Sequence, residues 1–225
     1  MFIEFVESLR CPVPHEESWL VAAADRMRGR TVVGGLLGCP LCGARYAIRD
    51  GVTYLGAPES PSPRDPAPPA PGGDDLLRAA ALLALVEPGG TAVLVGEWGR
   101  MGVGLRALAE VHLLLVNPPF EATSEEGVSV MRTGGTLPLA AGSVRGVALD
   151  VAAAHNAAML AGAVDALRTR GRLLAPVAAA LPAGVRELAR DEREWVAERD
   201  APARRPVIVP LGRAGGRRGE ATEQG

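Results

Sequence analysis

The sequence contains no lysine, although it has 225 residues and 24 basic side chains, all of them arginine. A protein without lysine cannot use a P-loop lysine, a lysine Schiff base or a lysine general base. Aromatic residues are scarce at 4%, so the core has to be built mainly from Ala, Val and Leu, within a hydrophobic content of 48%. The net charge of −2 gives no electrostatic reason to expect a general nucleic-acid-binding protein.

Long apolar runs are also absent. The longest is Ala79–Val86, far below the ~20 residues that a membrane span needs, so no membrane partner is expected. The first ten residues carry two Glu and no basic leader, which is unlike a signal peptide. Of the three cysteines, two stand in a Cys-x-x-Cys, so a metal site fits better than a disulfide scaffold. A cytoplasmic location is therefore expected.

Proline and glycine, by contrast, are plentiful and gather in one segment. Ala57–Gly73 contains seven prolines and no bulky apolar residue, which predicts an extended linker. This linker divides the chain into a small N-terminal module, Met1–Gly56, and a larger module, Asp74–Gly212. The polar, Gly-rich tail, Arg213–Gly225, is predicted to be disordered.

The N-terminal module is so short that its fold is expected to need a cross-link such as a metal site, and its cysteines offer one. Cys11 and His15 form a Cys-x3-His pair, and Cys39 and Cys42 follow after a spacer of 23 residues. Zinc takes four nitrogen or sulfur ligands in a tetrahedron, and two facing turns can supply two ligands each. These four residues are the predicted metal ligands. The spacer and the alternating run around Asp50-Gly51 predict two β-hairpins.

The stretch GCPLCGARYAIRDGVTYL, together with LRCP at Leu9–Pro12, resembles the zinc-ribbon activator subunits of methyltransferases. Those subunits are small partners of enzymes that act on transfer RNA, ribosomal RNA and release factors. The resemblance covers roughly Phe2–Leu55 and implies a small β-rich zinc ribbon. The chain departs from the family at Pro14, where a second cysteine is usual, and has His15 one place further on. Two interpretations stay open: a zinc ribbon, or a ribbon that keeps its fold without metal.

The larger module alternates short apolar strands with helical segments. Buried strands are predicted at Thr91–Val95, Val111–Val116, Val144–Leu149 and Arg172–Pro176. Such strands, separated by helices, predict an α/β fold: a Rossmann-like, doubly wound sheet with helices on both faces. The spacing of apolar residues in Val185–Arg199 predicts an amphipathic helix that covers the sheet or binds a protein partner. Val207–Leu211 is predicted as a final edge strand.

Three segments in order resemble the class I S-adenosylmethionine-dependent methyltransferases. They are VEPGGTAVLVG at Val86–Gly96, TLPLAAGSVRGVALD at Thr136–Asp150 and LRTRGRLLAPV at Leu167–Val177. They correspond to the family's first strand, fourth-strand region and fifth strand. The resemblance implies that S-adenosylmethionine would bind after the first strand and at the end of the second. The candidate cofactor-binding residues at these places are Gly96, Glu97, Gly99, Gly102 and Asn117.

The same region departs from the family pattern. Bulky Trp98, Arg100 and Met101 stand in the loop that lies against the cofactor, and Trp98 is predicted to fill part of the adenosyl site. Asn117 stands where the family has an acid that binds the ribose hydroxyls, and an amide is a weaker acceptor than a carboxylate. Arg145 likewise stands at a place where the family often has an acidic residue.

Two functions remain open at this point. One is a methyltransferase-like protein with a zinc ribbon in cis, in which S-adenosylmethionine binding is weakened or lost. Such a protein would act as a recognition or scaffolding module, with a partner on the ribbon or on the segment Val185–Arg199. The other is an active methyltransferase. The sequence identifies no catalytic residue and no methyl acceptor.

Overall fold

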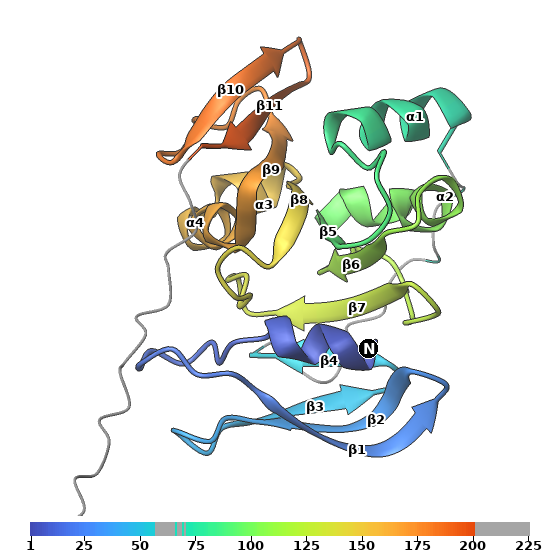
Figure 1. Cartoon of the computed structure of the whole chain (residues 1–225), viewed down its shortest axis with the longest axis vertical. Helices are drawn as coiled ribbons and strands as arrows, with labels where there is room; N and C mark the ends of the chain where they lie inside the picture. Colours follow the sequence, from blue (N-terminus) through green and yellow to red (C-terminus); the bar gives the residue numbers. More distant parts are fainter. Residues whose placement is uncertain (57–65, 67–68, 70, 201–225) are drawn as a thin grey trace, which may run out of the picture.

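A computed structural model of the chain describes residues 1–56, 66, 69 and 71–200 (Figure 1). The predicted tail 213–225, the predicted strand Val207–Leu211 and most of the predicted linker 57–73 lie outside these residues. The described residues form a mixed α/β structure, as the sequence predicts.

All eleven strands of the described residues belong to one sheet. They are β1 (Val21–Arg28), β2 (Thr31–Gly38), β3 (Arg45–Arg49), β4 (Val52–Leu55), β5 (Thr91–Val95), β6 (His112–Val116), β7 (Val128–Thr133), β8 (Val144–Ala148), β9 (Leu167–Pro176), β10 (Val185–Arg190) and β11 (Glu194–Arg199). Their order across the sheet is β1-β2-β3-β4-β7-β6-β5-β8-β9-β11-β10. The N-terminal strands join the rest because β4 pairs in parallel with β7, from Val52↔Val130 to Leu55↔Thr133. The predicted ribbon therefore shares its sheet with the larger module.

The central strands, β7-β6-β5-β8-β9, run parallel to one another. Taken in chain order, these five strands stand as third, second, first, fourth and fifth, so the direction of winding reverses between β5 and β8. In open α/β sheets with such a reversal, ligands bind beyond the carboxyl ends of the adjacent strands. The loops that follow β5, β6 and β8 are therefore the places where a site is expected.

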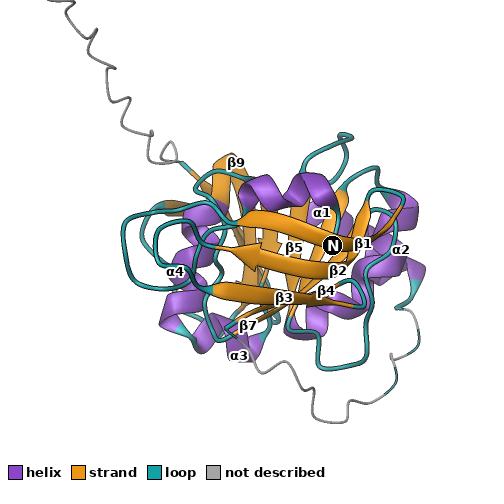
Figure 2. Ribbon diagram, turned by 90° about the horizontal axis from the view of Figure 1, so that it is seen from below, coloured by secondary structure: helices purple, strands orange, loops and turns teal. Residues whose placement is uncertain are grey.

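Helices cover both faces of the parallel part. Helices α1 (Gly73–Leu82) and α2 (Gly102–Leu108) pack on one face. The 3₁₀-helix η1 (Ile3–Ser8) and helices α3 (Val151–His155) and α4 (Ala157–Ala166) pack on the other. Figure 2 shows α2 and α4 on opposite sides of the strands. The connections from β6 to β7 and from β7 to β8 contain no helix, so the structure is richer in strands than the sequence predicts.

The turn between β3 and β4 confirms the hairpin predicted at Asp50-Gly51. Both residues have a positive φ, 49° for Asp50 and 82° for Gly51. Two successive residues of this kind are what a type I′ turn requires, and its twist matches that of the paired strands. The register is Arg49↔Val52, which leaves two residues in the loop.

The amphipathic helix predicted over Val185–Arg199 is wrong. The segment is a hairpin formed by β10 and β11, and β11 also pairs with β9. The carboxylate of Asp191 accepts the backbone N–H groups of Arg193 and Glu194, at 2.8 and 2.9 Å, and these bonds hold the turn. An Asp bonded in this way competes with helix formation. The hairpin also buries Trp195 completely against the sheet.

The side chain of His112, at the start of β6, is enclosed by aromatic rings. Phe2 and Phe5 stack on its imidazole with centroid distances of 5.0 and 5.8 Å. Its Nε2 lies 3.0 Å from the hydroxyl of Ser129. Burial, with smaller contributions from the N-terminal ammonium group and Arg106, lowers the pKa of His112 from 6.5 to about 4. The folded protein therefore keeps this imidazole neutral where the unfolded chain would protonate it.

The free energy of unfolding is expected to decrease as the pH falls from 7 to 4. The contribution of His112 is complete above pH 6.5 and is lost towards pH 4, because only the unfolded chain takes up the proton in this window. The loss amounts to about 3 kcal/mol. Urea unfolding at the two pH values measures it, and His112→Phe should lose about 3 kcal/mol less than the wild type. The control is His155→Gln, which alters an exposed histidine and should behave as the wild type. Equal pH dependence in the wild type and His112→Phe would contradict this assignment.

Candidate metal centre and cofactor loop

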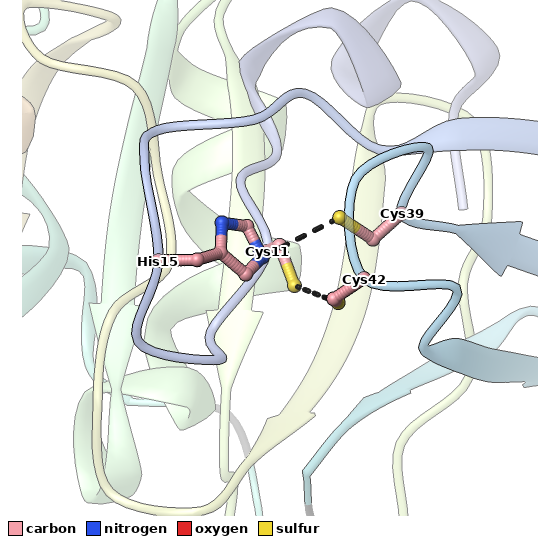
Figure 3. A group of neighbouring side chains, drawn as sticks. All are labelled: Cys11, His15, Cys39 and Cys42. Carbon is pink, nitrogen blue, oxygen red and sulfur yellow. Dashed lines mark hydrogen bonds between the residues drawn. The ribbon is translucent and has the colours of Figure 1, made fainter.

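Two loops bring the four predicted metal ligands together (Figure 3). Cys11 and His15 come from the loop after η1, and Cys39 and Cys42 from the turn between β2 and β3. In that turn the N–H of Gly43 donates to the carbonyl of Cys39 at 3.0 Å. Gly43 has a φ of 71°, a conformation that favours glycine. The ligand atoms, three sulfurs and one imidazole nitrogen, all lie within 4.8 Å of one another.

The distances within this cluster match a zinc tetrahedron. Zinc–sulfur bonds of about 2.3 Å and zinc–nitrogen bonds of about 2.0 Å give edges of about 3.8 Å between sulfurs and about 3.5 Å between sulfur and nitrogen. The sulfurs of Cys11 and Cys42 are 3.7 Å apart, and the sulfur of Cys39 lies 3.5 Å from Nε2 of His15. The three cysteines are free thiols. The residues therefore fit zinc in number, kind and spacing.

Neighbouring groups orient two of these ligands. The Nδ1–H of His15 donates to the backbone carbonyl of Glu16, which leaves Nε2 free to face the thiols. This bond, followed by a hydrogen bond with Cys11, raises the pKa of His15. The hydroxyl of Tyr46 lies 3.2 Å from the sulfur of Cys11. Burial first, and then the contact with Cys11, raises the pKa of Tyr46, so its hydroxyl keeps the proton that it donates. Such contacts fix the tautomer and direction of metal ligands.

Cys39 is buried and nevertheless acidic. Burial acts to raise its pKa, but hydrogen bonds from the backbone N–H groups of Cys42 and Leu41 and from the Ser18 side chain outweigh it. The result is a pKa lowered to about 6. Because the thiolate is the form that binds a metal, this turn favours cation binding at neutral pH.

The glycine-rich loop after β5, the 3₁₀-helix η2 (Gly96–Met101), is shaped by Asp150. Asp150 follows β8, and its carboxylate accepts the N–H of Glu97 at 3.2 Å and that of Ala153 at 2.8 Å. Gly96 has a φ of 62°, and a Cβ at this position would lie 1.7 Å from Oδ2 of Asp150. The structure therefore requires glycine at position 96 because of Asp150, whether or not a cofactor binds.

The other two candidate glycines face side chains of the protein itself. A Cβ at Gly99 would lie 3.2 Å from Pro118 and 3.3 Å from Phe120. A Cβ at Gly102 would lie 3.1 Å from the side chain of Leu115. Both glycines are buried. The space that they leave beside the loop is thus already filled.

Asn117 directly follows β6 and bonds to Thr133, the last residue of β7. It has a φ of 50°, in the left-handed region that asparagine tolerates. Its amide oxygen accepts the N–H of Thr133 at 2.8 Å, and its amide nitrogen donates to the carbonyl and the hydroxyl of Thr133, each at 3.3 Å. The amide is therefore directed at β7 and not at open space.

An open cavity of about 550 Å³ lies beyond the carboxyl ends of β5, β8 and β9. Of the five candidate cofactor residues, Glu97 lines this cavity. Trp98 also forms part of the wall, and its indole N–H donates to the carbonyl of Leu149 at 3.2 Å. The structure thus separates the candidate residues: Glu97 faces the cavity, whereas Gly99 and Asn117 lie against the end of β6.

Sequence reasoning missed part of this wall. Arg78 comes from α1. Arg193 comes from the turn, and Glu194 from the start of β11, in the hairpin that replaces the predicted helix. Arg78 lies 2.6 Å from a carboxylate oxygen of Asp191 and 2.6 Å from one of Glu194, so α1 is joined to that turn. Asp191 carried the missed signal, because Asp often bonds to the backbone two residues further on and starts a turn.

Arg145, which stands where the resemblance leads one to expect an acid, has a structural role on β8. The residue is 6% exposed, and its guanidinium donates to three backbone carbonyls. These belong to Ala84, Glu87 and Gly89, at 2.8, 2.6 and 2.8 Å. The three carbonyls belong to the segment that follows the end of α1. Arg145 therefore joins the segment between α1 and β5 to β8.

No protein-family model matches the chain, and no curated protein matches it. The solved structures that resemble it include a putative methyltransferase from an antibiotic biosynthesis pathway of Anabaena variabilis, with 18% identity and a TM-score of 0.41 over 48% of this chain and 46% of that one. The antibiotic-resistance methyltransferase Kmr has 15% identity and a TM-score of 0.39, over 56% of this chain and 93% of its own.

A third structure is the 16S rRNA N2 G1207 methyltransferase of T. thermophilus in complex with AdoMet and guanosine. It has 22% identity and a TM-score of 0.35, over 77% of this chain and 47% of its own. This chain therefore spans less than half the length of the Anabaena and T. thermophilus proteins. Among the described residues, no helix is both long and apolar enough to cross a membrane.

Proposed function

We propose that the chain is a methyltransferase-like protein with a zinc centre in cis, and that it acts as a recognition or scaffolding module. The strand order of the parallel part, with helices on both faces, supports a Rossmann-like, doubly wound sheet. The close grouping of Cys11, His15, Cys39 and Cys42 supports a Cys₃His zinc centre. Zinc would cross-link the loop after η1 to the turn between β2 and β3, as a closed four-ligand site does.

The closed end of β6 is the observation that supports weakened or lost binding of S-adenosylmethionine. In the family that the sequence resembles, the cofactor lies against the loop after the first strand and reaches the end of the second. Here Gly99 of that loop packs against Pro118 and Phe120, and Asn117 is bonded to Thr133. A nucleoside would have to displace these contacts, and after β6 its ribose hydroxyls would meet the amide of Asn117 in place of a carboxylate. We infer that binding is weakened or lost.

A protein partner near the metal centre is part of this proposal. Four apolar side chains around the two metal-binding loops are 41–62% exposed: Val13, Trp19, Val21 and Leu41. Exposed apolar groups in or beside these loops favour a protein interface there. The alternative partner surface on Val185–Arg199 is withdrawn, because that segment is a hairpin. The free thiols support a reducing compartment such as the cytoplasm.

An active methyltransferase of unknown acceptor is the second candidate, and the open cavity beyond β5, β8 and β9 favours it. Asp150 stands at the end of the fourth parallel strand, where a carboxylate could accept a proton. The two candidates differ in one measurable property, the affinity for S-adenosylmethionine.

We expect S-adenosylmethionine and S-adenosylhomocysteine to leave the thermal midpoint unchanged in a titration of the full chain. A ligand present at 100 times its Kd adds about 2.7 kcal/mol, which would raise the midpoint of a protein of this size by about 5–10 °C. Phe120→Ala enlarges the space beside Gly99, so a shift that appears only in this variant would support closure by the side chain. A saturable rise in the wild type would favour the active enzyme. Metal analysis of the same sample should give one zinc per chain.

A further inference from the structure

The cavity beyond β5, β8 and β9 has an interior that is partly apolar. Trp98, Met101 and Pro176 line it and are each half-buried. The indole of Trp98 is held in place by its hydrogen bond to the carbonyl of Leu149. A volume of about 550 Å³ lies within the range of small-molecule sites, which combine apolar walls with a few polar groups.

The charged side chains inside the cavity carry a net negative charge. Arg78 is compensated by Glu194 and by Asp191, each at 2.6 Å. Asp150 is also half-buried and accepts two backbone N–H groups, but within the described part of the chain it forms no ion pair. One carboxylate in the cavity is therefore without a cation.

The charged residues at the mouth of the cavity do not change its net charge. Two exposed acids, Asp75 and Glu97, stand there with two exposed arginines, Arg100 and Arg193. The lining as a whole therefore carries one more acid than arginine. An aromatic ring beside an uncompensated carboxylate attracts cations, because the face of the ring is itself electron-rich.

We propose that this cavity binds an organic cation that joins an ammonium group to an apolar body. The ammonium group donates a charge-assisted hydrogen bond to Asp150, and the body lies against Trp98, Met101 and Pro176. An anion of the same shape would be repelled, and a neutral molecule would remove water from Asp150 without replacing the charge. The proposal goes beyond the proposed function, since it requires neither a methyl donor nor a reaction.

The test is a calorimetric titration of the full chain near pH 7.5 with three probes of one shape. They are 2-phenylethylamine, which is a cation, 2-phenylethanol, which is neutral, and 3-phenylpropanoate, which is an anion. The amine should bind at least about tenfold more tightly than the alcohol, and the anion should bind least. Equal affinities for the three, or tighter binding of the anion, would overturn the proposal.

Variants locate the binding. Val151 is 61% exposed at the mouth of the cavity, so Val151→Trp fills the cavity without altering the bonds of Asp150 and should weaken amine binding at least about tenfold. Val86 is 85% exposed near the end of α1 and does not line this cavity, so Val86→Trp is the matched control and should bind as the wild type. Glu97→Gln should weaken binding of the amine while strengthening that of the anion. Unchanged amine affinity in Val151→Trp would show that the site lies elsewhere and would end the proposal.

Discussion

Cys39→Ser is expected to abolish zinc binding and to lower the free energy of unfolding by about 4 kcal/mol, when free zinc in the wild-type experiment is 1,000 times its Kd. The substitution removes the ligand whose thiolate the turn stabilises most, since its pKa is about 6. Serine keeps the size of the side chain, so the loss reports the metal rather than a new cavity. Zinc content and urea unfolding, measured on the same preparations, provide the test.

Without zinc, all the described residues should still unfold together, in one transition at a lower urea concentration. One hydrophobic core includes Leu37 from β2, Leu55 from β4 and Trp195 from β11, and β4 is paired with β7. Val13→Ala changes an exposed residue of the other metal-binding loop, the one after η1, and should leave both zinc content and stability unchanged. If Cys39→Ser still held one zinc per chain, or unfolded in two separate steps, this account would be wrong.

Arg145→Met is expected to lower the free energy of unfolding by about 4 kcal/mol. The substitution removes three hydrogen bonds from a charged donor and leaves the carbonyls of Ala84, Glu87 and Gly89 without those donors. Methionine fills most of the space of the arginine stem, so the effect comes mainly from the polar contacts. Urea unfolding of the wild type and the variant at pH 7 measures it.

Two further variants separate the hydrogen bonds from the charge. Arg145→Lys keeps a cation but cannot reach three carbonyls with a planar fork, so it should recover less than half of the loss. Arg168→Met removes a neighbouring exposed guanidinium and should change stability by no more than about 0.5 kcal/mol. A stability of Arg145→Met within this range of the wild type would refute the structural role given to Arg145.

Local patterns in the sequence predicted local structure well. The Asp50-Gly51 turn requires only two residues with positive φ between alternating strands, and the structure has it. The metal cluster also depends on short spacings, Cys-x3-His and Cys-x-x-Cys, that fold each pair into one turn. That the two pairs face each other follows from the pairing of β1 with β2, which the spacer predicted as a hairpin, and from the pairing of β2 with β3, which was not predicted.

Pairings between distant segments could not be predicted in this way. Nothing in β4 itself indicates that it pairs with β7, because both are short apolar strands that would suit several neighbours. The segment Val185–Arg199 has apolar residues at helical spacing, but the turn at Asp191 and the pairing of β11 with β9 decide its structure. For the same reason the lining contributed by Arg193 and Glu194 was missed.

The pairing of β4 with β7 also sets the order of events during translation. Val52 emerges from the ribosome about 80 residues before Val130, its partner in β7, which at about 5–20 residues per second is a delay of several seconds. The three preceding strands pair only with neighbours that are already synthesised, so their pairing does not have to wait for β7. During the delay β4 is an apolar edge strand with unpaired backbone groups, which other nascent chains can pair with. The yield of soluble protein should therefore rise with slow translation at low temperature, or with a chaperone that covers this edge strand.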